Sequence, residues 1–107
     1  MAHALHLGYA EYRHANHRPQ FNKGVFLKIN AYNRYTTNGI SGAVIKHICQ
    51  ENGVPLQSFI VGRDTLCGST IGPLISSKLC IRSIDVGIGQ VAMHSIRETC
   101  GVLVAYY

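Results

Sequence analysis

Residues 24–61 read GVFLKINAYNRYTTNGISGAVIKHICQENGVPLQSFIV. The apolar run over 24–30 predicts a short strand. Apolar residues then recur at helical spacing after a group of N-capping residue types, and a glycine and a proline follow them, so a helix is predicted over 39–52. Residues 56–61 predict a second strand. This part of the chain is therefore expected to form a strand–helix–strand unit.

The elements expected on either side continue this alternation. They are a loop over 1–23, a glycine-rich loop over 62–73, a helix capped by Ser69 or Thr70 that ends near Cys80, a strand over 81–86, a turn at 87–89 and a final helix from Val91. Strands that alternate with helices predict an α/β fold with mostly parallel strands. The length of 107 residues corresponds to about one domain.

Composition excludes two classes of protein. Hydrophobic residues make up 47% of the chain and charged residues 14%, which is unlike a disordered segment. No apolar run reaches the length of about 18 residues that a membrane-spanning helix needs. The net charge of +5 raises nucleic-acid binding as a possibility, but the basic residues are scattered and no nucleic-acid-binding motif is present.

The four cysteines have no C-x-x-C spacing, so a structural zinc site made of cysteines is not expected. No secretory signal pattern is seen at Met1. Reduced thiols fit a reducing compartment, and a cytoplasmic location is expected.

Two glycine-rich segments fail the spacing of nucleotide-binding loops. Five residues separate Gly62 from Gly68, where a P-loop has four, and no lysine follows Gly68; residues 87–89 lack the third glycine of a dinucleotide fingerprint. Backbone N–H groups at 68–70, before a helix, would favour an anion, and a plain strand-to-helix turn is the alternative. His94 follows the last predicted strand and is the best-placed single metal ligand or base.

Three motifs are more specific. They are MAHALHLGY (1–9) with NHRP (16–19), DTLCGSTIGP (64–73) and DVGIGQVAMHSIRE (85–98). Together they resemble the M18 family of metalloaminopeptidases, the aspartyl aminopeptidases, over essentially the whole chain. The resemblance implies an enzyme with two zinc ions per active site that releases Asp or Glu from peptide N-termini. It also implies a three-layer α/β catalytic domain and assembly into dodecamers.

The resemblance assigns roles to individual residues. His94 corresponds to a zinc ligand, His3 lies beside the metal site, and Lys28 corresponds to the residue that meets the acidic side chain of the substrate. A cation suits a carboxylate partner, which would explain a lysine inside an apolar strand. The remaining substrate-binding residues are expected to be Tyr35, Gly68, Ser69 and Thr70.

The rest of the family's metal site has no counterpart in the sequence, including its carboxylate ligands and the glutamate general base. One imidazole cannot hold zinc, which takes about four ligands. We therefore expect residues 1–107 to be the C-terminal portion of an M18 catalytic domain, with an active-site loop over 1–23 and a βαβαβα unit over 24–107. Alone, this portion is expected to be inactive.

The expected partners are peptides with an acidic N-terminal residue and further copies of the protein, with neither nucleic acid nor membrane. Two alternatives stay open. One is a non-catalytic module that docks on a full-length homologue, and the other is a basic nucleic-acid-binding domain.

Overall fold

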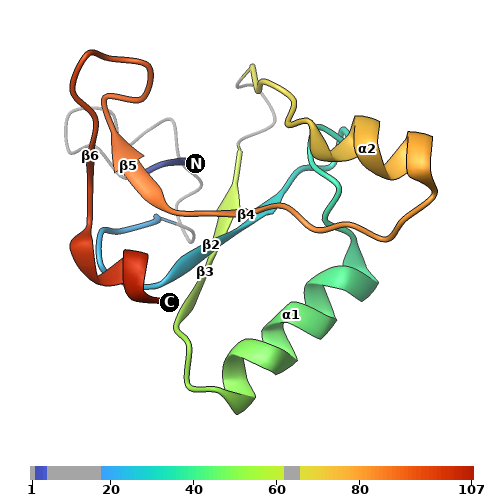
Figure 1. The fold of residues 1–107 in the computed structure, drawn as a ribbon, viewed down its shortest axis with the longest axis horizontal. Helices are drawn as coiled ribbons and strands as arrows, with labels where there is room; N and C mark the ends of the chain where they lie inside the picture. The colour runs from blue at the N-terminus through green and yellow to red at the C-terminus, as the bar shows by residue number, and fades with distance from the viewer. Residues whose placement is uncertain (1, 5–17, 62–65) are drawn as a thin grey trace.

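The computed structural model describes residues 2–4, 18–61 and 66–107, which form two small three-stranded sheets and two α-helices (Figure 1). One sheet has the order β3-β2-β4, with bounds Leu56–Ile60, Val25–Ile29 and Val86–Gly87. The other has the order β1-β5-β6, with bounds Ala2–His3, Gly89–Val91 and Thr99–Cys100. Within the described ranges, no helix is long and apolar enough to cross a lipid bilayer.

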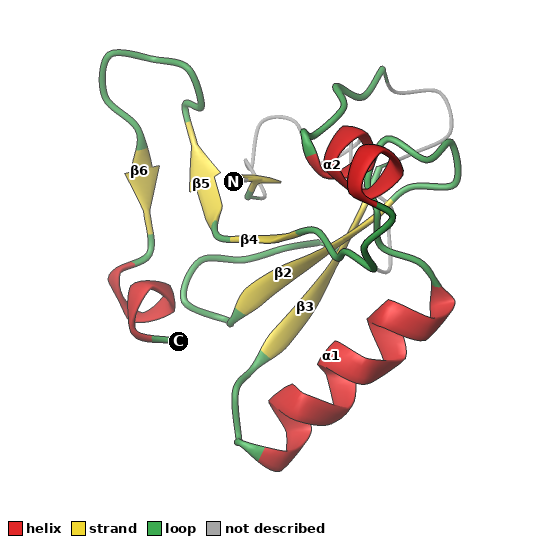
Figure 2. Ribbon diagram, turned by 45° about the vertical axis from the view of Figure 1, so that its right-hand side comes forward, coloured by secondary structure: helices red, strands yellow, loops and turns green. Residues whose placement is uncertain are grey.

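The strand–helix–strand unit forms as predicted. β2 and β3 pair in parallel along their full length of five residues. Helix α1 (Gly39–Glu51) is the crossover between them (Figure 2). Its N-terminus is a capping box, because the Asn38 side chain accepts the Ser41 N–H at 2.9 Å and Ser41 Oγ accepts the Asn38 N–H at 3.1 Å. The N-cap expected from the sequence is confirmed.

Side chains of β2 pack on both sides of the strand, because successive side chains of a strand point to opposite sides. Leu27 is 1% exposed and faces α1 at Gly42. Phe26 is 0% exposed, points the other way and stacks on Phe59 with the ring centroids 6.2 Å apart. Lys28 shares the Phe26 side of the strand, so a cation is placed beside an aromatic core.

Helix α2 (Gly72–Leu79) lies where the sequence predicts a helix, but the expected cap is wrong. Ile71 occupies the N-cap position and makes no side-chain cap hydrogen bond. The hydroxyls of Ser69 and Thr70 turn back to the carbonyl of Arg34, at 3.3 and 3.5 Å. Tertiary contacts, and not a local cap, therefore hold the loop before α2.

The predicted strand over 81–86 is wrong for most of its length. Only Val86–Gly87 form a strand, β4, and it runs antiparallel to β2. The segment before it is held by side chains: the Asp85 N–H donates to Thr37 Oγ1 at 3.1 Å. A main-chain donor used in this way does not contribute to a regular sheet ladder.

The final helix predicted from Val91 is also wrong. Strand β5 pairs with β1 on one side and β6 on the other, and a 3₁₀ helix over Val102–Tyr106 follows. Ala92 and His94 have φ angles of 58° and 71°, which a right-handed helix excludes. The turn predicted at 87–89 is not observed either, because Gly87 ends β4 and Gly89 begins β5.

The N-terminal loop predicted over 1–23 contains the short strand β1, which is parallel to β5. Other sequence features lie outside the described residues, namely His6, His14, His17 and the loop segment 62–65. The longest pairing is parallel, and the two antiparallel pairings span two residue pairs each. The α/β class is confirmed.

Candidate functional site

A cavity of about 370 Å³ gathers side chains from segments that are far apart in the sequence. It lies between β1, β2, the loop that precedes α2 and the turn after β5. Every residue that the sequence analysis placed in the site lines this cavity: His3, Lys28, Tyr35, Gly68, Ser69, Thr70 and His94. Folding therefore brings these residues together, while the role of each stays a prediction.

Lys28 is the buried cation of this cavity. Strand β2 places it on the wall with 6% of its surface exposed. Its Nζ lies 5.4 Å from the centroid of the Tyr35 ring, a cation–π contact. Among the described residues, no carboxylate forms an ion pair with it. Burying an ammonium without a counter-ion is costly, and an anionic group in the cavity would offset that cost.

Tyr35 connects Lys28 to the loop that follows β3. Its hydroxyl lies 3.0 Å from Cys67 Sγ, and its ring packs on Phe59 with the centroids 6.4 Å apart. The Cys67 thiol also donates to the carbonyl of Gly68 at 3.3 Å. The sequence analysis included Cys67 in the second motif and among four thiols, but it assigned Cys67 no role of its own in the site. Its position next to Gly68 in the second motif was the available signal that it belongs to the site.

Asp85 accepts hydrogen bonds from two of the segments around the cavity. Its Oδ2 accepts hydrogen bonds from the N–H and the hydroxyl of Thr36, at 2.7 and 2.8 Å, and from the Thr70 hydroxyl at 3.0 Å. Its backbone carbonyl accepts the N–H of Lys28 at 3.0 Å. Sequence reasoning placed Asp85 at a strand end and did not identify this structural role, because its partners are 15 to 49 residues away.

The anion site expected from N–H groups at 68–70 is not supported at Thr70. The Thr70 N–H donates to the carbonyl of Arg34 at 3.1 Å. Helix α2 begins only at Gly72, so its N-terminus does not start at these residues. Gly68 and Ser69 do line the cavity. The cation of Lys28 is therefore the stronger anion-recognition group in this part of the chain.

His94 lies on a tight turn after β5 and is exposed. Its N–H donates to the Glu98 carboxylate, and the Ser95 N–H donates to the carbonyl of Ala92 at 3.0 Å. These bonds hold the left-handed backbone of the turn. His94 lines the cavity and is an exposed residue, a position compatible with its predicted role as a metal ligand.

The described residues do not form a complete zinc site, and His94 stays a predicted zinc ligand. Zinc takes about four ligands. In residues 2–4, 18–61 and 66–107, no group of three or more His, Cys, Asp or Glu side chains is able to hold a metal ion.

Known proteins are similar to this chain in both sequence and fold. The family model described as aminopeptidase I zinc metalloprotease (M18) matches residues 1–106. The aspartyl aminopeptidase of Dictyostelium discoideum is 53% identical over 102 residues, which cover 95% of this chain and 21% of that protein. This chain thus spans about a fifth of the length of that curated relative.

Solved structures agree with the sequence match. A chain of the cryo-EM structure of the Ape4 and Nbr1 complex superposes with a TM-score of 0.90 at 44% identity, covering 94% of this chain and 19% of that chain. A chain of the S. cerevisiae mApe1 dodecamer superposes with a TM-score of 0.81 at 32% identity, covering 94% and 22%. By sequence and by fold, this chain belongs to the M18 family of zinc metallopeptidases.

Proposed function

We propose that this chain is the C-terminal portion of the catalytic domain of an aspartyl aminopeptidase and that its cavity receives the acidic N-terminal side chain of a peptide. The observation that carries the proposal is Lys28, a buried ammonium on the cavity wall with no ion-pair partner in the described chain. A substrate carboxylate would provide the missing counter-charge through a charge-assisted hydrogen bond.

The other proposed roles follow from the same cavity. Tyr35 would orient the lysine through its ring, the 68–70 turn would line the substrate pocket, and His3 would lie beside the metal site. His94 supplies one nitrogen ligand to a site of two zinc ions whose other ligands and general base lie outside this sequence. We accordingly propose that the isolated chain is inactive.

We further propose that the complete protein is a homo-oligomer, since a matched relative forms a dodecamer. A cytoplasmic location is proposed as well. All four cysteines are free thiols in the structure, which is in keeping with a reducing compartment.

The test is a chimera in which this chain replaces the matching segment of the D. discoideum enzyme. The chimera should release N-terminal Asp or Glu in preference to Ala. Lys28→Met should lower kcat/KM for an Asp substrate by about 10–100-fold, the effect of losing a hydrogen bond to a charged group. Activity toward an Ala substrate should change little. The measurement is steady-state kinetics on paired Asp and Ala substrates.

Lys46→Met is the matched control, because Lys46 is an exposed lysine of α1. An unsubstituted chimera that is folded but does not prefer acidic substrates would refute the proposal. So would a Lys28→Met chimera that keeps the full preference for Asp over Ala.

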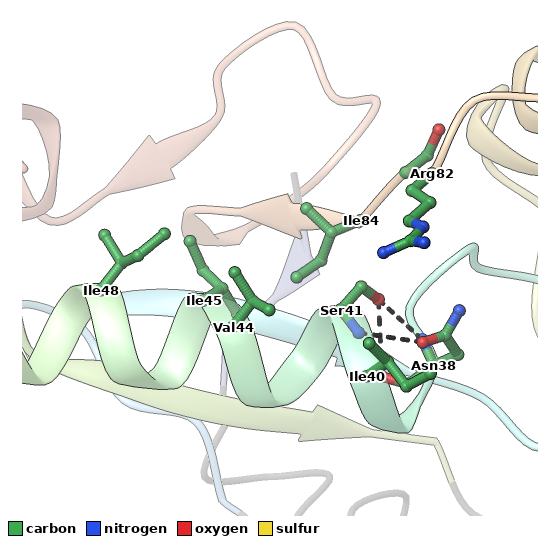
Figure 3. A pocket seen from close by; sticks show the side chains of 9 residues that line it. Asn38, Ile40, Ser41, Val44, Ile45, Ile48, Arg82 and Ile84 are labelled. Atoms are coloured by element: carbon green, nitrogen blue, oxygen red, sulfur yellow. Dashed lines mark hydrogen bonds between the residues drawn. The ribbon is translucent and has the colours of Figure 1, made fainter.

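A second candidate function is docking on the remainder of a larger M18 chain. Helix α1 leaves an apolar row open to solvent, with Ile40, Val44 and Ile48 exposed by 72%, 55% and 49%. Together with Arg82 and Ile84, this row lines a groove of about 490 Å³ (Figure 3). Neighbours at a spacing of four residues form one continuous face. The matched relatives are about five times as long as this chain and provide the chain that would cover this face.

Docking predicts that this chain is retained by a tagged fragment of the D. discoideum enzyme that lacks the matching segment. Val44→Ser with Ile48→Ser should weaken retention at least about tenfold, since burial of each side chain is worth about 1.5–3 kcal/mol. Lys46→Ser with Gln50→Ser, on the polar side of the same helix, is the control. Equal retention of both double variants would exclude the α1 groove as the docking face.

A further inference from the structure

We propose that Cys67 is a modification site of the cavity, at which a small anionic disulfide exchanges with the thiol. That such an adduct would also block the acidic-substrate pocket rests on the proposed function. The exchange itself depends only on the cavity and on two of the groups that line it, the Cys67 thiol and the Lys28 cation.

The four cysteines differ in their surroundings. Cys49 is buried, and Cys80 and Cys100 are exposed on the surface. Cys67 is partly exposed and is the one cysteine that lines the cavity with Lys28. A reagent that enters the cavity can therefore reach Cys67, while Cys49 reports whether the fold has opened.

A second observation points to an anionic ligand at the same place. Lys28 has 6% of its surface exposed, so it is more than nine-tenths buried. It lines the cavity and has no ion-pair partner among the described residues. Tyr35 contacts both groups, since its ring lies 5.4 Å from Lys28 Nζ and its hydroxyl 3.0 Å from Cys67 Sγ. The thiol and the cation thus contact the same tyrosine side chain, and a carboxylate on the disulfide can meet Lys28 while a sulfur meets Cys67.

The chemistry is ordinary thiol–disulfide exchange. The Cys67 thiolate attacks one sulfur of the disulfide, a new S–S bond forms and the original S–S bond breaks. The leaving thiolate takes up the proton that Cys67 has lost. The incoming disulfide is the oxidant, because one half is reduced to a thiol as Cys67 is oxidised. Excess thiol reverses the reaction. A cavity of about 370 Å³ falls in the range of small-molecule sites.

The experiment compares glutathione disulfide, which is anionic, with bis(hydroxyethyl) disulfide, which is neutral, on the purified chain. Adduct formation at each cysteine is followed by peptide mass mapping over time. The ratio of the anionic to the neutral rate at Cys67 should fall about tenfold in Lys28→Met and in Lys28→Gln, as expected for the loss of one nearby cation. The same ratio at Cys80 and Cys100 should not change. Lys46→Met is the control.

Two variants and Cys49 keep the result interpretable. If Cys49 becomes reactive in Lys28→Met, the fold of that variant has opened. The rate ratio at Cys67 in Lys28→Gln then tests the proposal. An unchanged ratio at Cys67 in a variant with unreactive Cys49 overturns the proposal, and so does a Cys67 that reacts no faster than Cys49 in the unsubstituted chain. Protection of Cys67 by free L-aspartate tests the proposed function separately. A Lys28-dependent ratio without protection supports the modification site and counts against acidic-substrate binding.

Discussion

Replacing Gly24 by alanine is expected to lower the free energy of unfolding of this chain by about 4 kcal/mol or more. Gly24 has a φ of 103°, a conformation that residues with a side chain rarely adopt. A Cβ there would lie 2.0 Å from the carbonyl oxygen of Pro55. That carbonyl accepts the Val25 N–H at 3.0 Å, the bond that opens the β2–β3 pairing. The side chain would therefore push apart the two strands that carry the core.

Gly53→Ala is the matched control for Gly24→Ala. Gly53 also has a positive φ, 64°, but nothing lies within 4 Å of its added Cβ. It should cost only about 1–2 kcal/mol, the usual penalty for a left-handed residue. Urea unfolding followed by circular dichroism measures both variants. Equal losses in the two variants would show that the clash with Pro55 does not matter.

Replacing Asp85 by alanine is expected to cost about 3–5 kcal/mol of stability. Three hydrogen bonds converge on its Oδ2, two from Thr36 and one from Thr70. Bonds to a charged acceptor are worth more than neutral ones, and their loss leaves the main-chain N–H of Thr36 without its partner. The loop before α2 should also separate from residues 34–37. Unfolding in urea measures the first effect, and amide hydrogen exchange at Thr36 and Thr70 measures the second.

Asp85→Asn should fall between the parent and Asp85→Ala, because an amide oxygen still accepts hydrogen bonds but carries no charge. Glu51→Ala, which removes an exposed carboxylate at the end of α1, should change stability by no more than about 0.5 kcal/mol. If Asp85→Ala resembles Glu51→Ala in both measurements, the carboxylate does not organise the cavity.

The accuracy of the sequence predictions depends on the range of the interactions involved. The 39–52 helix was predicted nearly to the residue, because its capping group and its apolar spacing are local features of the chain. Residues 81–101 were predicted poorly. A strand was expected over 81–86, and only the apolar spacing from Val91 onward suits a helix. Instead, β5 pairs with β1 and β6, and two left-handed residues follow it. Pairing with a strand some 87 residues away overrides local preference.

The candidate site shows the same division. The resemblance of three motifs to the M18 family named seven residues, and all seven line one cavity. It did not identify Cys67 as a neighbour of Tyr35 or Asp85 as the residue that holds Thr70 and Thr36. Those relations are hydrogen bonds between loops, and a motif records residue types without their contacts.

The sequence by itself determines the family, the α/β class and the central strand–helix–strand unit of this chain. It can do so because motifs, helix caps and hydrophobic periodicity are properties of residues that are neighbours in the sequence. The tertiary structure alone decides that Lys28 is a buried cation without an ion-pair partner in the described chain and that Cys67 shares its cavity. The physical reason is burial: the cost of desolvating a charge and the reach of a thiol depend on what surrounds them, and segments distant in the sequence provide those surroundings.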